Sequence, residues 1–230
     1  FSAEMGREFT KKELEDALHC VNLHFDTVKH EKKLIRISEK TGIEVCVLSG
    51  DVVSRSEGIS AMMNKPVFVD YLRDSAMYSS DKYTKAFARA GKEYEGFLLY
   101  EKYTRRDATR ILGWNKKQNE QNIGGYKLNK EVCNCPIFVT YHKSDDIEGS
   151  IAYEDSFITP GRFKWMSRSK RRLDSEELQP MIHARANGLR IPLFVKKDDN
   201  EGIDFYYLGD VLPIDGGIEQ EYMPGNDGKL

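Results

Sequence analysis

The sequence has few of the features that identify membrane-spanning or secreted proteins. No run of about eighteen apolar residues occurs, so no transmembrane helix is predicted, and no signal peptide is recognisable. The cysteines Cys20, Cys46, Cys133 and Cys135 are scattered, which is typical of reduced thiols in a cytoplasmic protein. The chain begins with Phe-Ser instead of Met, so we expect a piece of a longer protein.

Patterns that hold metal ions or carry out catalysis are also missing. Cys133 and Cys135 lie one residue apart without a second pair, whereas structural zinc sites use pairs about two to four residues apart. There is no Walker loop, Gly-x-Ser-x-Gly or His-Glu-x-x-His motif. His142 and Lys143 are adjacent, which differs from the His-x-Lys spacing of phospholipase D-type nucleases. Glu31-Lys-Lys33 has a nuclease-like spacing but lies in a predicted helix. We expect no catalysis and no cofactor here.

The composition indicates a packed chain whose charge is unevenly distributed. Of 230 residues, 40% are hydrophobic and 11% aromatic, enough for a core. The net charge is only −2, but residues 198–230 hold nine acids and one base, so residues 1–197 carry about +6. A basic body beside an acidic end is compatible with an anionic partner such as nucleic acid.

Residues 1–92 are predicted to form a helical coupler segment. Thr10 and Glu13 have the spacing of a capping box, which begins a helix. Apolar residues then recur at steps of three and four, so the helix is expected to run to about Lys33. Further short helices are expected over 60–64 and 66–75. The apolar stripe consists of Leu14, Leu18, Val21, Phe25 and Val28.

Residues 93–230 are predicted to form a strand-rich domain with two short helices. The helices are expected between Thr104 and Gly113 and between Asp174 and Gly188, with a kink or break at Pro180. A closed or nearly closed barrel would protect the strand edges, so the predicted fold class is α+β. The expected strands are 96–102, 136–142, 189–195 and 203–214, the last two forming a hairpin.

The most informative segment is 162–172, which holds six cations and no acid, with Phe163 and Trp165 interleaved. Lys and Arg neutralise phosphates, and an aromatic ring offers a stacking face to a base. A solvated basic surface is the alternative interpretation. The predicted contacts to the DNA backbone in this segment are Arg162, Lys164, Arg168, Lys170, Arg171 and Arg172.

A second basic cluster surrounds the predicted helix that follows Thr104. Arg105, Arg106 and Arg110 belong to it and are predicted to contact phosphates, as is Lys143 after the strand 136–142. A charged surface helix with no ligand is the alternative.

An acid beside aromatic residues precedes the basic segment. A carboxylate can accept a hydrogen bond from the cytosine amino group while rings cover the faces of a base removed from the stack. The alternative assigns the rings to the core and the acids to solvent. The candidates for a base pocket are Tyr153, Glu154, Asp155, Phe163 and Trp165.

Several separated blocks resemble one domain family in the same order. They are 122–128, 135–143, 151–157, 163–169 and 193–199 through 204–209. They are similar to the C-terminal domain of bacterial proteins that join a phospholipase D-like nuclease to a helicase-type ATPase. Among characterised proteins, this domain resembles the target-recognition part of SauUSI-like type IV restriction enzymes, which cleave DNA containing modified cytosine.

The resemblance implies a noncatalytic target-recognition domain with an SRA-like or B3-like DNA-binding barrel. Its partners would be double-stranded, methylated DNA and the helicase and nuclease domains of the same protein, with no membrane. The parent would be an ATP-dependent restriction endonuclease. The base, a 5-methylcytosine-type base, would be read by flipping or in the groove. A protein-interaction module that couples helicase to nuclease, with only weak DNA contact, is the alternative.

Overall fold

The computed structural model describes residues 8–24, 26–31, 33–114, 123–142, 155–169 and 171–221. The chain divides into two compact units. Unit 1 comprises residues 1–89 with 115–117, and unit 2 comprises residues 90–114 with 118–230. In the described ranges, no helix is both long and apolar enough to span a membrane.

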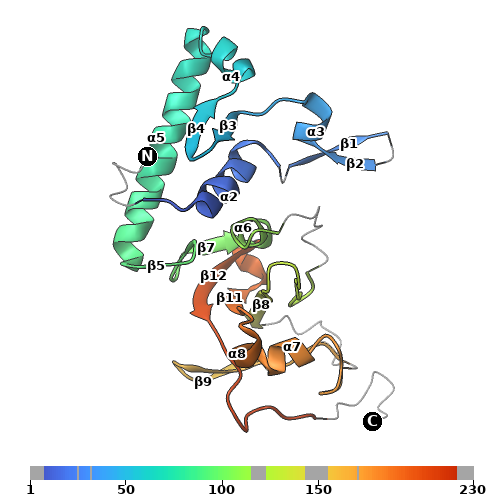
Figure 1. The fold of residues 1–230 in the computed structure, drawn as a ribbon. Coiled ribbons are helices and arrows are strands. Elements are labelled where there is room, and N and C mark those ends of the chain that lie inside the picture. The colour runs from blue at the N-terminus through green and yellow to red at the C-terminus, as the bar shows by residue number, and fades with distance from the viewer. Residues whose placement is uncertain are drawn as a thin grey trace. The chain divides into compact units, whose positions relative to one another are not determined.

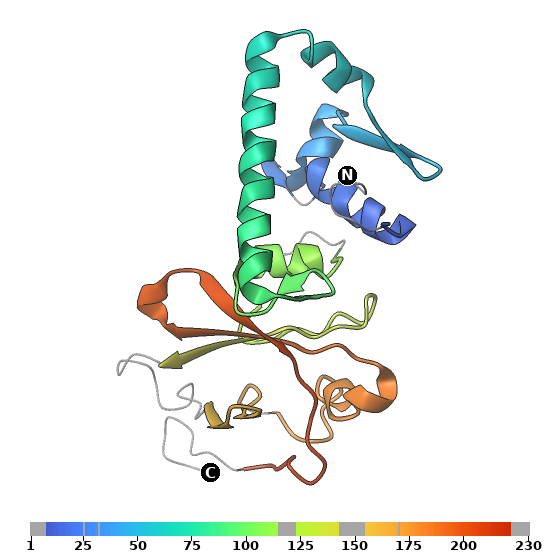
Figure 2. The same cartoon turned by 90° about the vertical axis from the view of Figure 1, so that its left-hand side faces the viewer.

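Unit 1 combines helices with two small antiparallel hairpins, β1–β2 and β3–β4 (Figures 1 and 2). Its longest helix, α5, begins at Pro66 and continues to Ala90, well beyond the predicted end near residue 75. The elements are α2 (Lys11–Val21), β1 (Thr27–His30), β2 (Lys33–Arg36), α3 (Ile37–Thr41), β3 (Cys46–Ser49), β4 (Val52–Arg55), α4 (Glu57–Met62) and α5 (Pro66–Ala90).

The first predicted helix starts as expected. The Thr10 backbone N–H donates to Glu13 Oε2 at 2.8 Å, and the Glu13 N–H donates to Thr10 Oγ1 at 3.3 Å, which completes the capping box. The helix ends at Val21 instead of near Lys33, and two strands follow it. The prediction of an entirely helical segment over residues 1–92 is therefore wrong.

A contact with a distant strand explains this early end. The Asn22 side-chain oxygen accepts from the backbone N–H groups of Val45 and Cys46 at 2.8 and 2.9 Å, and its amide donates to the Cys46 carbonyl at 2.8 Å. Leu23 then adopts a positive φ of 55°, which ends the helical path. Local periodicity carries no information about a partner more than twenty residues away.

Unit 2 is built on a four-stranded sheet in the order β7-β12-β11-β8 (Figure 1). β8 and β11 run parallel, and the other neighbours are antiparallel. The elements are β5 (Glu93–Tyr94), β6 (Phe97–Leu98), β7 (Lys102–Thr104), α6 (Arg105–Ile111), β8 (Ile137–His142), β9 (Ser156–Thr159), β10 (Arg162–Lys164), α7 (Gln179–Ile182), α8 (Ala184–Asn187), β11 (Pro192–Asp198), the 3₁₀ turn η2 (Asp199–Glu201) and β12 (Asp204–Asp210).

Both faces of the sheet are buried, and successive side chains alternate between them. α7 and α8 cover one face and α6 the other (Figure 1). The first cluster, on the α7–α8 side, consists of Tyr126, Cys135, Ile137, Val139, Leu178, Met181, Ala184, Leu189, Ile191, Leu193 and Val195. The second cluster, on the α6 side, consists of Phe97, Ala108, Leu112, Trp114, Ile123, Phe138, Phe194, Phe205 and Tyr207.

The strand predictions are mostly confirmed. The segments 136–142 and 203–214 contain β8 and β12, whereas 189–195 only overlaps β11, which begins at Pro192 and continues to Asp198. β11 and β12 pair as an antiparallel hairpin, as predicted. The predicted strand 96–102 is interrupted, because Tyr100 has a positive φ of 65° and turns the chain between β6 and β7. The Tyr100 N–H donates to the Tyr207 carbonyl at 2.8 Å, so the interruption itself is fixed to β12.

The helix after Thr104 is confirmed as α6. Thr104 Oγ1 accepts from the Asp107 N–H at 3.0 Å, and Gly113 adopts a positive φ of 72° after the last turn. The helix predicted from Asp174 is reduced to α7 and α8, which meet at His183. Pro180 lies in the first turn of α7, where proline needs no intrahelical partner, so it does not cause the break.

The α+β class is confirmed, but the described strands do not close into a barrel. β9 and β10 pair with each other and not with β7 or β8, which are the two edges of the four-stranded sheet. Of the closed or nearly closed barrel that was expected, the closed form is therefore absent from the described ranges, and a nearly closed SRA-like or B3-like barrel stays a prediction.

A buried hydrogen bond joins the end of α6 to the turn before β8. Trp114 Nε1 donates to Asn134 Oδ1 at 2.6 Å, and Asn134 Nδ2 donates to the Leu112 carbonyl at 3.2 Å. Trp114 and Asn134 are 1% and 4% exposed, so no water replaces these bonds readily.

Asn134→Ala is expected to destabilise unit 2 by about 1–3 kcal/mol, because it leaves the Trp114 N–H and a carbonyl buried without a partner. Denaturant unfolding followed by tryptophan fluorescence measures this, since Trp114 and Trp165 are the only tryptophans and both belong to unit 2. Asn200→Ala, at an exposed position of η2, is the matched control and should change stability by less than about 0.5 kcal/mol. Equal stability of the two variants would contradict the assigned role.

Candidate nucleic-acid interface

The basic segment, residues 162–172, begins in β10 and continues without helix or strand over its described residues 165–169 and 171–172. β10 pairs with β9, with Phe163 opposite Phe157. Asp155 Oδ1 accepts from the Met166 N–H at 3.0 Å, so the residue before β9 is tied to the chain that leaves β10. The hairpin is thus closed at its base by a side-chain contact as well as by the strand ladder.

The two rings of the basic segment pack partly against the first cluster. Trp165 meets the Tyr126 ring edge-on, with centroids 5.1 Å apart, and Phe163 lies 4.7 Å from Phe157. Of the base-pocket candidates, Asp155, Phe163 and Trp165 are therefore neighbours around one hairpin. Tyr153 and Glu154 lie outside the described residues. Contact with a base stays a prediction.

Arg168 is bound by the protein itself. Its guanidinium donates from Nε to the Gly124 carbonyl at 3.1 Å, from Nη2 to the Tyr126 carbonyl, and from Nη1 to Glu177 Oε1 at 3.2 Å. It also lies over the Tyr126 ring, 4.5 Å from the centroid. These contacts fasten the middle of the basic segment to the chain before β8 and to the turn before α7. They give Arg168 a structural role, while its predicted phosphate contact stays a prediction.

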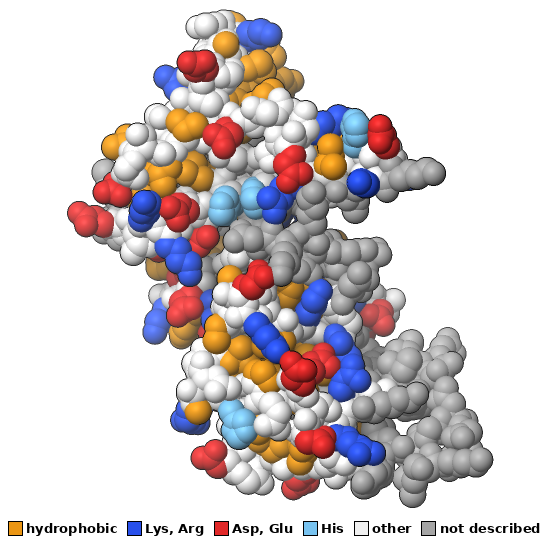
Figure 3. Space-filling view, turned by 45° about the vertical axis from the view of Figure 1, so that its right-hand side comes forward, with side chains coloured by type: hydrophobic (Ala, Val, Ile, Leu, Met, Phe, Trp, Pro, Cys, Tyr) orange, Lys and Arg blue, Asp and Glu red, His pale blue; other side chains and the backbone are white. Residues whose placement is uncertain are grey.

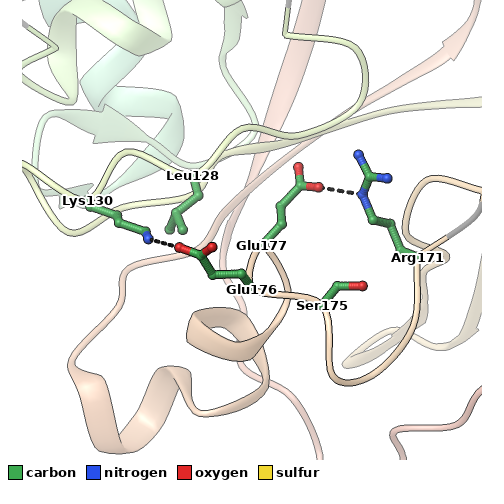
Figure 4. A pocket seen from close by; sticks show the side chains of 6 residues that line it. All are labelled: Leu128, Lys130, Arg171, Ser175, Glu176 and Glu177. Atoms are coloured by element: carbon green, nitrogen blue, oxygen red, sulfur yellow. Dashed lines mark hydrogen bonds and ion pairs between the residues drawn. The ribbon is translucent and has the colours of Figure 1, made fainter.

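Glu177 joins Arg168 to Arg171, whose Nε donates to Glu177 Oε2 at 2.6 Å. The next acid, Glu176, pairs separately with Lys130 at 2.9 Å. Figure 4 shows these two ion pairs side by side. They lie in an open hollow of about 570 Å³ lined by Leu128, Lys130, Arg171, Ser175, Glu176 and Glu177.

The hollow is lined by two cations and two acids, which argues against a binding site for a simple anion. The hydrogen bond that Arg171 donates to Glu177 raises the pKa of Arg171, and the bond that Lys130 donates to Glu176 lowers the pKa of Glu176. Burial raises the pKa of Tyr126 to about 12, so its phenol is neutral at physiological pH. Because Tyr126 belongs to the first cluster, apolar packing lies beneath the charged side chains near the hollow.

The two ends of the basic segment differ from its middle. Arg162 and Arg172 are exposed, and no described residue pairs with either side chain. Lys164 Nζ lies 3.8 Å from Glu221 Oε1, a loose surface pair. Lys170 and Lys143 lie outside the described residues. An external anion therefore has direct access to Arg162 and Arg172.

Two cations in or next to the second basic cluster, Arg105 and Lys102, lie over aromatic rings. The Arg105 guanidinium lies 4.7 Å from the Phe205 centroid and 5.4 Å from that of Phe138, and its burial lowers its pKa. Lys102 lies 4.6 Å from the Tyr206 centroid. Arg106 and Arg110 lie on α6, and Arg106 is exposed. On the face shown in Figure 3, Lys and Arg side chains are interspersed with Asp and Glu.

Sequence reasoning missed the partners of the basic segment. The helix predicted between Asp174 and Gly188 places Glu176 and Glu177 in its first turn, but they lie in a turn before α7 and pair with Lys130, Arg168 and Arg171. Their position shortly after the basic segment is the only sequence signal for this pairing. Within the described ranges, no cluster of three or more His, Cys, Asp or Glu side chains is arranged to hold a metal ion.

A protein-family comparison matches residues 97–230 to a domain described as "Domain of unknown function (DUF3427)". The match covers more than half of the chain, and it includes the four-stranded sheet and the whole basic segment. No curated protein sequence matches the chain.

Arg168→Ala is expected to destabilise unit 2 by about 1–3 kcal/mol, because two carbonyls and Glu177 lose their shared donor. Arg172→Ala removes the same kind of side chain from an exposed position and should change stability by less than about 0.5 kcal/mol. Denaturant unfolding followed by tryptophan fluorescence compares them. If both variants match the wild type, Arg168 does not fasten the segment.

Proposed function

The chain belongs to the DUF3427 family, and on that premise we propose that it is the noncatalytic DNA-recognition part of a modification-dependent restriction enzyme. It binds duplex DNA and reads a 5-methylcytosine-type base. The nuclease and helicase-type ATPase are other domains of the same cytoplasmic protein, and this part needs no cofactor.

The observation that carries the proposal is the arrangement of cations along the basic segment. Arg168 is held by three protein acceptors, so the segment has a fixed course on unit 2. Arg162 and Arg172, on either side of this anchor, are exposed and have no partner among the described residues. Because the anchor fixes the backbone between them, these two exposed cations meet phosphates with less loss of chain freedom, which favours binding to a regular polyanion such as duplex DNA.

Modified-base readout is supported by the chemistry next to these cations. Asp155, Phe163 and Trp165 supply a carboxylate and two rings around one hairpin. With Tyr153 and Glu154, they form the proposed base pocket. An SRA-like or B3-like architecture belongs to the same proposal, with the four-stranded sheet at its centre.

Exposed apolar residues on α5 favour a second function, a module that couples the helicase to the nuclease. Val67, Tyr71, Met77 and Tyr78 are between 64% and 72% exposed on one helix of unit 1. Large apolar side chains at such exposure are suited to protein contacts. In this case unit 2 would touch DNA only weakly and without preference for a modified base.

Binding to matched duplexes that differ only in cytosine methylation separates the two functions. A recognition domain should bind the methylated duplex more tightly, by roughly fivefold or more if one methyl group is read by apolar contact. Fluorescence anisotropy across a salt series provides the measurement. Equal, weak binding to both duplexes would overturn the recognition proposal and favour the coupling module.

Arg162→Ala combined with Arg172→Ala should weaken binding to both duplexes equally and lower the salt slope by about 0.9 for each lost phosphate contact. Arg185→Ala, at an exposed position of α8, is the control and should leave the slope unchanged. A double variant with the wild-type slope would remove these two residues from the interface.

Glu177→Gln should tighten DNA binding by roughly two- to fivefold, because Arg171 is released from its ion pair and becomes available to phosphate. Arg168 also loses its ion pair with Glu177 but keeps its two carbonyl acceptors, so the segment stays anchored. Glu176→Gln removes the same charge from the same hollow but frees Lys130 instead. It therefore serves as the matched control in the same anisotropy titration. Equal effects of the two substitutions would mean that only net charge matters, not the release of Arg171.

A further inference from the structure

We infer that the tip of the β9–β10 hairpin is an apolar wedge that enters the DNA duplex and opens a base step, with Ile158 as the inserted side chain. This inference rests on the proposed DNA-binding function and assigns the element that distorts the duplex. Four observations carry it: the exposure of Ile158, the irregular ladder around it, the charge along the hairpin, and a contrasting second hairpin.

Ile158 is 61% exposed although it lies within a strand. The paired residues show why. Arg162 lies opposite Thr159 and Phe163 opposite Phe157, so Ile158 is an extra residue without a partner on β10. Such a bulge bends the strand and redirects a side chain. Here Phe163 packs against the first cluster, and the Phe157 ring lies 4.7 Å from it and is 40% exposed, less than the 61% of Ile158.

The side chains of the hairpin tip are apolar, uncharged polar or basic, and none is acidic. Residues 156–172 contain no Asp or Glu. The acids in contact with the hairpin lie at its base, where Asp155 binds Met166 and Glu221 approaches Lys164. At the other end, Pro160 and Gly161 form the turn, and exposed Arg162 follows directly. The tip therefore offers aliphatic surface beside a cation and, among the described residues, no contacting acid.

This combination fits duplex DNA better than a protein partner. Aliphatic side chains inserted between base pairs separate a step, and neighbouring cations bind the phosphates on either side. Opening a step costs a few kcal/mol, and it lowers the cost of removing the adjacent base from the stack. The wedge thus supplies the distortion that base flipping requires, while Asp155, Phe163 and Trp165 of the proposed pocket lie around the same hairpin.

A second hairpin in unit 2 shows what an exposed isoleucine looks like without this charge pattern. Ile203, at the turn between β11 and β12, is 73% exposed. It is flanked by Glu201 and Asp204 and lies close to Asp198 and Asp199 in sequence. These acids repel DNA phosphates, so Ile203 is a matched position at which no insertion is expected.

The test uses the full chain and a duplex carrying 2-aminopurine next to a 5-methylcytosine, because the fluorescence of this base analogue rises when its stacking is lost. Wild type should bind and raise the fluorescence. Ile158→Ala and Ile158→Gln should abolish most of the rise and weaken binding roughly tenfold, as expected for loss of a buried aliphatic side chain. Ile203→Ala should behave as wild type. Unchanged tryptophan fluorescence in the free variants verifies the fold.

Each other result counts against the wedge. If wild type binds the duplex without a fluorescence rise, or the Ile158 variants match wild type, the wedge is wrong and the DNA-binding function stands. If wild type binds no DNA, both proposals fail together. If sedimentation shows that Ile158→Ala breaks a dimer while DNA binding is kept, the tip contacts a second copy of the chain and the wedge is wrong.

Discussion

The parallel pairing of β8 with β11 is the contact on which unit 2 depends. Its register places Phe194 beside Phe138 and sets Leu193 and Val195 beside Ile137 and Val139. Because successive side chains alternate, this one register supplies aromatic residues to the α6 side and aliphatic residues to the α7–α8 side. A shift by one residue would exchange the two sets and leave neither helix layer with a matching surface.

The basic segment is organised by the same core. Tyr126 belongs to the first cluster, and its ring and carbonyl hold Arg168. Glu177 then divides its two oxygens between Arg168 and Arg171. The sequence alone does not distinguish the cations of the basic segment from one another. In the structure, the middle of the segment is bound to the protein, whereas its two ends are accessible. In the proposed function, the exposed ends would meet phosphates from a backbone whose course is already fixed, which costs less conformational freedom than binding by a mobile chain of the same composition.

The sequence predicted elements whose signals are local. The Thr10–Glu13 capping box, the cap at Thr104 and the strand at 136–142 depend on residues a few positions apart, and all are present. The errors share a cause, which is a distant partner. Asn22 binds the chain before β3 and ends a helix that periodicity extends, and the segment around Tyr100 binds β12 and interrupts an apparently continuous strand.

The sequence by itself determined the α+β class, the basic composition of residues 162–172 and the rings within them, because these follow from local propensity and residue identity. It did not determine which cations remain available. Whether an arginine meets solvent or a carboxylate depends on chain segments that only folding brings together, as Glu177 does with Arg168 and Arg171. Likewise, Ile158 is exposed at an irregularity in the pairing of β9 with β10. A β-branched residue in a strand gives no sequence signal for such an irregularity.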